Sequence, residues 1–258
     1  MAARLSPARG WDVLLELTRA EIKQERELSL PGVAKWILEP LSYTVVYFLL
    51  VVVILNRNRF AYPLFLLCAL VPWRYFTGVV FRSMGLLRSY ASLISNRSVP
   101  KAILPAVVLA SEVPTFLLAI TLLAPMMAYF RIVPTPALLW LPVVVGVLLL
   151  LSSGPCYLGA VFGLYFPDYR GAVQNLIRMG FFMSTALVPA AELPGEELPR
   201  VLDLNPVSGI FDSMRAIVLE GRAPHPFDLL YPAAVGLGVL LAGVVLYRHR
   251  QDQFAKDV

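Results

Sequence analysis

The sequence predicts an all-α membrane protein. The predicted protein has six transmembrane helices, an N-terminal amphipathic interface helix, and re-entrant helices between the fifth and sixth spans. Of its 258 residues, 58% are hydrophobic and 15% are charged, against about 45–50% and about 25% in a soluble domain. The apolar residues form continuous runs of about 18–25, long enough to cross a hydrocarbon core of about 30 Å. Because the runs do not alternate with polar residues, helices fit better than barrel strands.

The first element is a predicted amphipathic helix over residues 11–28. Its apolar residues, among them Trp11, Leu14 and Ile22, recur near helical spacing. A charged face accompanies them, made of Glu16, Arg19, Lys23, Glu25, Arg26 and Glu27. This pattern is typical of a helix lying on a membrane surface. A solvated helix packed on a cytosolic partner is the alternative.

Six spans follow in order. We place them at residues 36–55, 60–81, 102–130, 137–166, 172–189 and 229–247. With both termini in the cytoplasm, inside segments carry 15 Lys and Arg residues and outside segments carry six. Lysine and arginine concentrate on the cytoplasmic side, so this orientation is favoured.

The chain accordingly divides into three parts. Residues 1–35 form a cytoplasmic tail with the interface helix, 36–247 a six-helix transmembrane domain, and 248–258 a second cytoplasmic tail. Within the domain, the proline-rich segment 191–228 contains one helical stretch, residues 208–219. We expect it to dip into the outer leaflet and return, because irregular backbone at that depth needs protein or a water-filled cavity beside it. An ordinary external loop is the alternative.

Three ionisable residues fall at similar depth in three spans. Arg74 and Arg178 each lie eight residues from an arginine at the cytoplasmic end, which is about 12 Å of helix. Glu112 lies about 16 Å into its span. Since a charge in the bilayer is costly unless paired, we expect Glu112 to pair with Arg74 or Arg178. Arginines that snorkel to the headgroups are the alternative.

Aromatic residues crowd the span ends and the middle helices, including Trp73, Phe76, Phe162, Phe181 and Phe182. They fit an interfacial belt and core packing, or the lining of a pathway in which aromatic faces stack on sugar rings. The sequence lacks a Gly-x-x-x-x-Gly-Lys-Ser/Thr loop, a Cys/His cluster and an acid–nucleophile constellation. No cofactor or metal is therefore expected, an enzyme is disfavoured, and a pump of this kind needs its motor on another chain.

Several short motifs in this order resemble the permease subunit of bacterial type-2 ABC exporters, in the polysaccharide-export group that moves O-antigen, capsule or teichoic acid. Residues 17–25, Leu-Thr-Arg-Ala-Glu-Ile-Lys-Gln-Glu, are similar to the family's interface-helix pattern, with its final arginine one place later at Arg26. The other matches are residues 71–76 (Val-Pro-Trp-Arg-Tyr-Phe), Ser111-Glu112, residues 166–170 (Phe-Pro-Asp-Tyr-Arg), and Asn205-Pro206 followed by Arg215. Pro167 stands where the family has arginine.

The resemblance implies a transport subunit of the bacterial inner membrane. Two copies would form a channel, two ATP-binding subunits would dock beneath them, and the substrate would be a lipid-linked glycan; no nucleic acid is involved. It implies ATPase-coupling roles for Glu21, Lys23, Arg26, Arg82, Arg88, Arg97, Asp168 and Arg170. It implies pathway roles for Trp73, Arg74, Tyr75, Phe76, Glu112, Phe162, Tyr165, Phe181 and Phe182. A permease of the same fold that exports drugs or small lipids is the alternative.

Overall fold

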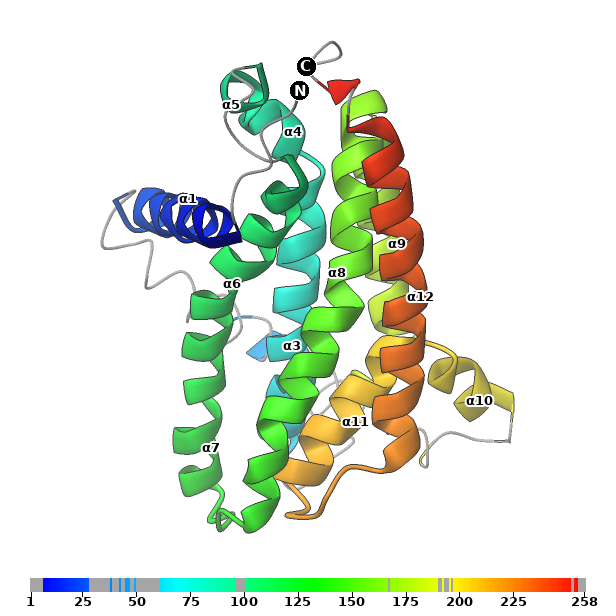
Figure 1. Cartoon of the computed structure of the whole chain (residues 1–258). Helices are drawn as coiled ribbons and strands as arrows, with labels where there is room; N and C mark the ends of the chain where they lie inside the picture. Colours follow the sequence, from blue (N-terminus) through cyan, green and yellow to red (C-terminus); the bar gives the residue numbers. More distant parts are fainter. Residues whose placement is uncertain are drawn as a thin grey trace.

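The structure, a computed structural model, describes residues 7–27, 61–95, 101–166, 168–189, 197–251 and 253–254, with single residues at 38, 42, 45, 46, 49, 192 and 195. This part of the chain is helical and contains no strand (Figure 1). Its longer helices are α1 (Pro7–Glu27), α3 (Tyr62–Ser83), α6 (Leu104–Thr121), α8 (Leu141–Tyr165), α9 (Tyr169–Phe182), α11 (Pro206–Val218) and α12 (Pro226–Arg250). The shorter ones are α4 (Leu86–Ser89), α5 (Ala91–Ser95), η2 (Lys101–Ile103), α7 (Leu123–Tyr129), η3 (Pro136–Trp140) and α10 (Glu197–Asp203).

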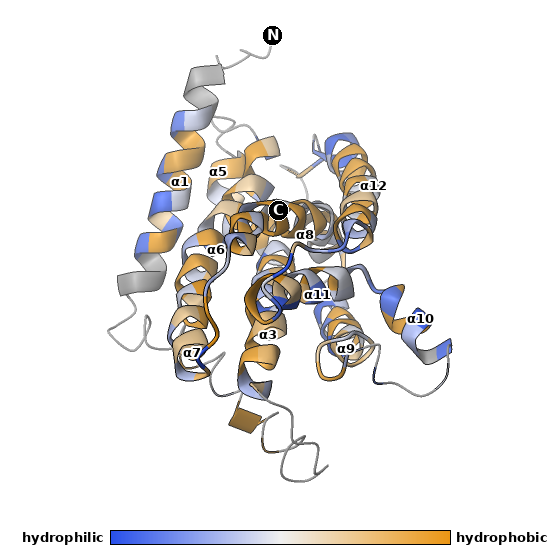
Figure 2. Ribbon diagram, turned by 90° about the horizontal axis from the view of Figure 1, so that it is seen from below, coloured by the Kyte–Doolittle hydropathy of each residue, from blue (hydrophilic) through white to orange (hydrophobic). Residues whose placement is uncertain are grey.

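Four helical stretches among the described residues are long and apolar enough to cross a membrane. They are Tyr62–Ser83, Lys101–Tyr129, Pro136–Tyr165 and Pro226–Arg250. These agree with the second, third, fourth and sixth predicted spans. In Figure 1 they run roughly parallel, while α1 lies across the bundle near the end that carries α4 and α5. Figure 2 shows the apolar character of the long helices and the mixed faces of α1.

The other two predicted spans have different outcomes. The first, at 36–55, lies outside the described residues except for five single positions. The fifth was predicted at 172–189, but α9 ends at Phe182 and residues 183–189 are not helical. With 14 residues, α9 is only about 21 Å long at 1.5 Å per residue, shorter than a bilayer core. The predicted helical stretch at 208–219 is confirmed as α11.

Proline explains where the third predicted span breaks. Pro105 lies at the start of α6, where a missing N–H is tolerated, and Pro114 lies inside the helix. The helix ends at Thr121, four residues before Pro125, and α7 begins two residues later. A proline ring clashes with the carbonyl four residues earlier. The break therefore falls where the ring of Pro125 meets the carbonyl of Thr121.

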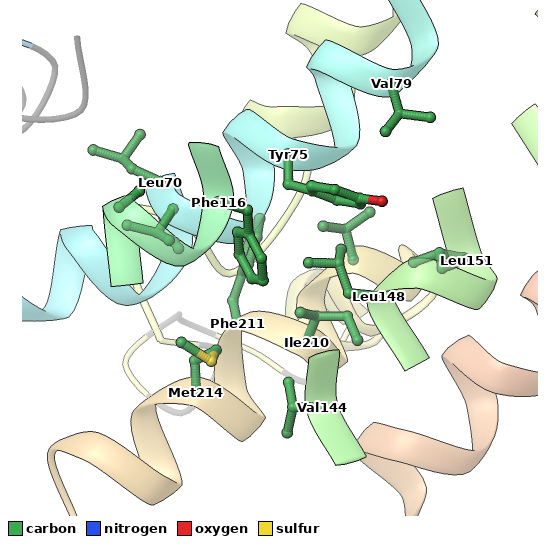
Figure 3. Close-up of a cluster of buried hydrophobic side chains, with 14 of the residues drawn as sticks. Leu70, Tyr75, Val79, Phe116, Val144, Leu148, Leu151, Ile210, Phe211 and Met214 are labelled. Carbon is green, nitrogen blue, oxygen red and sulfur yellow. The ribbon is translucent and has the colours of Figure 1, made fainter. Parts of the chain in front are cut away.

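The core of the bundle is built where α11 passes between the long helices. Tyr75 of α3, Phe116 of α6, Leu148 of α8 and Phe211 of α11 gather there as buried side chains (Figure 3). The described part of α11 is buried over most of its length. A 13-residue helix is too short to cross the bilayer, so α11 contributes packing to the lower half of the bundle in Figure 1.

The helices α8 and α12 meet along a seam of glycines. A Cβ at Gly154 of α8 would lie 2.6 Å from the backbone nitrogen of Leu240 in α12. A Cβ at Gly236 of α12 would lie 2.8 Å from the Cα of Leu151 in α8. Small residues allow the backbones of two membrane helices to approach closely. Gly154 and Gly236 permit this close approach between α8 and α12.

Gly154→Val is therefore expected to lower the stability of the protein, because the added side chain meets backbone that cannot rotate away. Overpacking of this kind costs about 1–3 kcal/mol or more. Gly146→Val is the matched control, since the same helix has open space at that position. Thermal unfolding in detergent, followed by size-exclusion fluorescence, should show a lowered Tm for the first variant alone. Equal Tm values would contradict close packing at the seam.

Candidate functional site

The amphipathic helix α1 is tied to the bundle through Glu21. One carboxylate oxygen, Oε2, accepts a hydrogen bond from Nη2 of Arg82 at 2.5 Å, and the other, Oε1, accepts from the hydroxyl of Tyr90 at 2.5 Å. Burial and the hydrogen bond to Glu21 raise the pKa of Tyr90 well above its usual value. The phenol therefore keeps its proton and remains a donor. Through these two bonds α1 holds the end of α3 and the turn between α4 and α5.

Arg82 extends this link into the bundle. Its Nη1 lies 3.3 Å from Oε1 of Glu112 on α6, and the side chain of Glu112 is 7% exposed. One guanidinium thus bridges a carboxylate on the interface helix and a buried carboxylate on a spanning helix. Because the Arg82 and Glu21 side chains are each 24% exposed, solvent reduces the strength of the outer pair relative to the inner one.

Arg74 lies beside the same carboxylate. A Cβ at Gly78 would lie 2.8 Å from Nη1 of Arg74 and 2.9 Å from Oε2 of Glu112, so those two atoms are no farther apart than the sum of these distances. Arg74, Gly78 and Arg82 occupy successive turns of α3. Glycine in the middle leaves room for two arginines and a carboxylate. We name this set, together with Glu21 and Tyr90, the charge network.

The sequence analysis expected Glu112 to pair with Arg74 or Arg178. The structure adds Arg82 as the partner that also reaches α1, places Arg74 against the same carboxylate, and leaves Arg178 exposed on α9. The spacing of eight residues between Arg74 and Arg82 could have revealed that both lie on one face of a helix. The predicted second span ended at residue 81, which left Arg82 in the cytoplasmic loop, so its place on the same helix face as Arg74 was missed.

The loop around α4 also contacts the ends of the other spans. Nη2 of Arg88 donates to the carbonyl of Leu164 at 3.0 Å, which satisfies an open carbonyl at the end of α8. Nζ of Lys101 donates to the carbonyl of Gln251 at 3.0 Å, and the hydroxyl of Tyr247 donates to the carbonyl of Lys101 at 2.7 Å. The segment from Arg82 to Lys101 is therefore bonded to α1, α6, α8 and α12.

The remaining predicted coupling residues are placed less tightly. Lys23, Asp168 and Arg170 are exposed, the last two at the start of α9. Arg26 lies within α1, but its side chain is not among those the structure describes, and Arg97 lies outside the described residues. Arg88 keeps an exposed side chain while bonded to α8.

Four of the predicted pathway residues form one aromatic cluster. The ring of Trp73 on α3 lies 5.7 Å from that of Phe76 and 5.3 Å from that of Phe181 on α9. Phe182 lies 5.7 Å from Phe181, and Phe211 of α11 lies 6.3 Å from Trp73. Phe181 is buried, whereas Phe182 is 54% exposed. The cluster thus runs from the core of the bundle to its surface.

The other predicted pathway residues lie elsewhere, so the nine do not form a single lining. Tyr75 is a core side chain whose hydroxyl donates to the carbonyl of Leu109 at 3.1 Å. Phe162 lies near the end of α8, 5.6 Å from the ring of Tyr169. Tyr165 has the guanidinium of Arg250 5.7 Å from its ring centre. Arg74 and Glu112 belong to the charge network, on the face of α3 toward α6.

The structure also reveals a corner that the sequence analysis did not identify as a site. The side chain of Asn205 caps α11, with Oδ1 accepting from the backbone N–H of Val207 at 3.2 Å. Its Nδ2 donates to the carbonyls of Gly180 and Met183 at 2.8 and 3.1 Å. These carbonyls lie at the end of α9. One asparagine therefore joins the end of one helix to the start of another.

Arg215 completes this corner from within α11. Its Nη1 donates to the carbonyl of Thr185 at 2.7 Å and to Oδ1 of Asp212 at 2.9 Å, and its Nη2 donates to the carbonyl of Ala186 at 2.8 Å. The guanidinium carbon lies 3.5 Å from the ring centre of Phe65. The side chain of Arg215 is 4% exposed, so the guanidinium is buried in this corner. The Asn-Pro start of a helix followed by an arginine at i+10 was the available signal.

The fold and the site together define a polytopic helical membrane protein whose interface helix is bonded to its spans. No protein-family model matches the chain. It is 27% identical over 247 residues, 95% of each chain, to the O-antigen export system permease protein RfbA of Myxococcus xanthus. It is 21% identical to a Klebsiella pneumoniae protein of the same name, again over 95% of each chain. It is 25% identical to the polysialic acid transport protein KpsM of Escherichia coli over 84% of each chain.

The predicted relationship is thereby confirmed: the chain is related to the permeases of polysaccharide-exporting type-2 ABC transporters along nearly its whole length. These relatives are transport proteins by name, and the four apolar helices of this chain indicate a multi-pass membrane protein.

Proposed function

We propose that this chain is the membrane permease of an ATP-driven exporter that moves a lipid-linked polysaccharide, such as O-antigen or teichoic acid, across the bacterial cytoplasmic membrane. The relatives named for O-antigen export and polysialic acid transport support the substrate class. The observation that carries the mechanism is the bridge from Glu21 through Arg82 to Glu112. It connects the amphipathic helix with a buried charge inside a spanning helix.

In this proposal two ATP-binding subunits dock on α1 and on the loop from Arg82 to Lys101. A displacement of α1 pulls on Glu21, and through Arg82 it acts on α3 and α6 together. Arg88 and Lys101 extend the same displacement to α8 and α12. Arg88 remains exposed and offers a bidentate donor to carboxylates of the partner. In this proposal residues 1–35 hold the interface helix that receives the displacement, residues 36–247 form the transmembrane domain that it moves, and residues 248–258 form the second cytoplasmic tail.

The proposed permease crosses the membrane six times, with both termini in the cytoplasm and with two copies enclosing the route. The first crossing is residues 36–55. The fifth begins as α9 and continues through the non-helical residues 183–189, after which α10 and α11 return the chain within the outer leaflet. This path is supported by the corner described above: Asn205 and Arg215 satisfy backbone carbonyls that lipid could not.

The proposed route for the glycan passes the aromatic cluster of Trp73, Phe76, Phe181 and Phe182. Phe182 presents its ring at the surface of α9, where a sugar ring could stack on it. Membrane proteins that export drugs or small lipids through the same fold remain the alternative, and the relatives do not favour it.

Co-purification with an ATP-binding subunit tests the proposal. The complex, reconstituted in nanodiscs, is expected to hydrolyse ATP faster in the presence of lipid-linked oligosaccharide than in its absence. A hydrophobic drug at the same concentration should not increase the rate. If hydrophobic drugs alone increase the rate of ATP hydrolysis, the protein is an exporter of drugs or small lipids instead. A permease that purifies without any ATP-binding partner and still transports glycan would refute the ATP-driven mechanism.

A further inference from the structure

The surface of α9 carries two adjacent sectors of opposite chemistry. Arg170, Gln174 and Arg178 lie on successive turns and are exposed, with Phe182 one turn farther along the same row. We call these four residues the polar row of α9. Asn175 lies beside this row and is exposed as well. The buried residues of the helix, Val173 and Phe181, adjoin the edge of this row at Arg170 and pack against the bundle.

The second exposed sector of α9 is apolar. It consists of Ala172, Leu176 and Met179, all exposed. At about 100° per residue these three gather within one arc, separate from the arc that holds Arg170, Gln174 and Arg178. A helix that faced lipid over its whole exposed surface would have no reason for this division. The apolar sector suits lipid, and the polar row requires water or polar groups.

The three polar residues of this row have no polar partner among the residues that the structure describes. Within the described part of the chain, Arg170, Gln174 and Arg178 make no ion pair and no side-chain hydrogen bond. Arg178 lies eight residues beyond Arg170, about 12 Å along the helix. In the proposed fifth crossing Arg178 lies within the membrane, where arginine is rare unless it faces a water-filled cavity or a partner group.

A second copy packed directly on the polar row is disfavoured by charge. A two-fold axis brings the same patch of both copies together, so arginine would face arginine. Residues 169–182 include no aspartate or glutamate to compensate. A hydrated space occupied by an anionic group satisfies both arginines, whose planar forks bind phosphate and carboxylate through two parallel hydrogen bonds.

We propose that the polar row of α9 is a binding site for anionic groups, phosphate or carboxylate, on the transported glycan. This inference rests on the proposed function. Arg170 and Arg178 bind the anionic groups, the amide of Gln174 bonds sugar hydroxyls between them, and the exposed ring of Phe182 stacks on a sugar ring. The ring of Phe182 contacts that of Phe181, which contacts that of Trp73, so the proposed site continues into the aromatic cluster.

The first test is the accessibility of α9 in the assembled exporter. Single variants Gln174→Cys and Arg178→Cys are compared with Leu176→Cys and Met179→Cys, which lie on the apolar sector. The native thiols Cys68 and Cys156 are buried, so the background is low. A membrane-impermeant methanethiosulfonate reagent is expected to modify positions 174 and 178 and to leave 176 and 179 largely unmodified. Equal reaction in both sectors, or none at 174 and 178, would overturn the inference.

The second test is protection by defined anions. Inorganic pyrophosphate and trigalacturonic acid are each expected to slow modification of Gln174→Cys several-fold, and maltotriose, a neutral trisaccharide, is not. Protection by pyrophosphate alone assigns the site to the phosphate of a lipid carrier, and protection by trigalacturonic acid alone assigns it to acidic sugars of the polymer. Adding Arg178→Gln should abolish either effect. Equal protection by maltotriose, or protection that survives Arg178→Gln, would refute an anion site.

These outcomes are separate from those of the proposed function. An exporter whose ATP hydrolysis responds to lipid-linked oligosaccharide, yet whose positions 174 and 178 do not react, retains its function and loses only this site. If positions 174 and 178 are modified and protected as expected while no ATP-binding partner is found, the anion site is supported and the ATP-driven mechanism is refuted.

Discussion

In the proposed exporter, Arg82→Gln is expected to abolish most glycan export while leaving the complex with the ATP-binding subunit intact. The variant removes the bridge between Glu21 of α1 and Glu112 of α6. Hydrolysis by the partner would then displace α1 without moving α3 and α6. A weakening of coupling by about 1.4 kcal/mol already corresponds to tenfold. Export of lipid-linked glycan from inverted vesicles is measured alongside ATP hydrolysis, and the ratio of the two is expected to fall at least about tenfold.

Two controls separate coupling from folding. Glu21→Gln should lower the same ratio, whereas Glu16→Gln, an exposed carboxylate on the same helix, should not. Because Arg82→Gln leaves Glu112 with less compensation in a buried position, the double variant Arg82→Gln with Glu112→Gln is included. It should recover the Tm of the native protein but not its export, since non-additive effects are expected within one network. Export that recovers together with Tm would show that the network only stabilises the fold.

Arg215→Met is expected to cause the largest loss of stability of any single substitution considered. The guanidinium of Arg215 donates hydrogen bonds to the carbonyls of Thr185 and Ala186 and to the carboxylate of Asp212. The Arg215 side chain is almost fully buried. Removing the guanidinium leaves two buried carbonyls without a donor, and an unsatisfied buried polar group costs about 1–3 kcal/mol each. Arg215→Lys should rescue little, since a single ammonium cannot match the planar fork of donors. Both variants are measured by thermal unfolding of the detergent-solubilised protein.

Arg222→Met is the matched control for this prediction. Arg222 lies seven residues farther along the chain, its side chain is 58% exposed, and it pairs with the exposed Glu220. Exposed pairs of this kind contribute about 0–1 kcal/mol, so the Tm of this variant should remain close to that of the native protein. Similar Tm values for Arg215→Met and Arg222→Met would show that the corner does not depend on the buried guanidinium.

Much of the fold followed from local properties of the sequence. The long apolar stretches at Tyr62–Ser83, Lys101–Tyr129, Pro136–Tyr165 and Pro226–Arg250 agree with predicted spans, because helix length and bilayer thickness fix such elements without reference to their neighbours. The amphipathic pattern after Trp11 likewise gave α1. The fifth span was predicted too long, since hydropathy continues past Phe182 although the helix does not.

The partners of the charged residues did not follow in the same way. The sequence placed Glu112 and Arg74 at membrane depth and assigned Glu21 and Arg82 to a cytoplasmic interface, but it could not show that Arg82 belongs to both sets. That depends on how α1 lies against α3 and α6, which are brought together from positions far apart in the chain. The partners of Arg215 could not be found along the chain for the same reason, since Thr185 and Ala186 precede it by about thirty residues.

The sequence by itself determined that the chain is a helical membrane protein similar to polysaccharide-export permeases, because hydrophobic length, charge bias and short motifs are read along the chain. Only the tertiary structure decided which charges meet, which aromatic rings form one cluster, and which face of α9 stays polar and exposed. The physical reason is that a side chain's electrostatic environment is set by helices adjacent in space, and helix packing is decided by small residues such as Gly78 and Gly154 whose effect appears only when two helices meet.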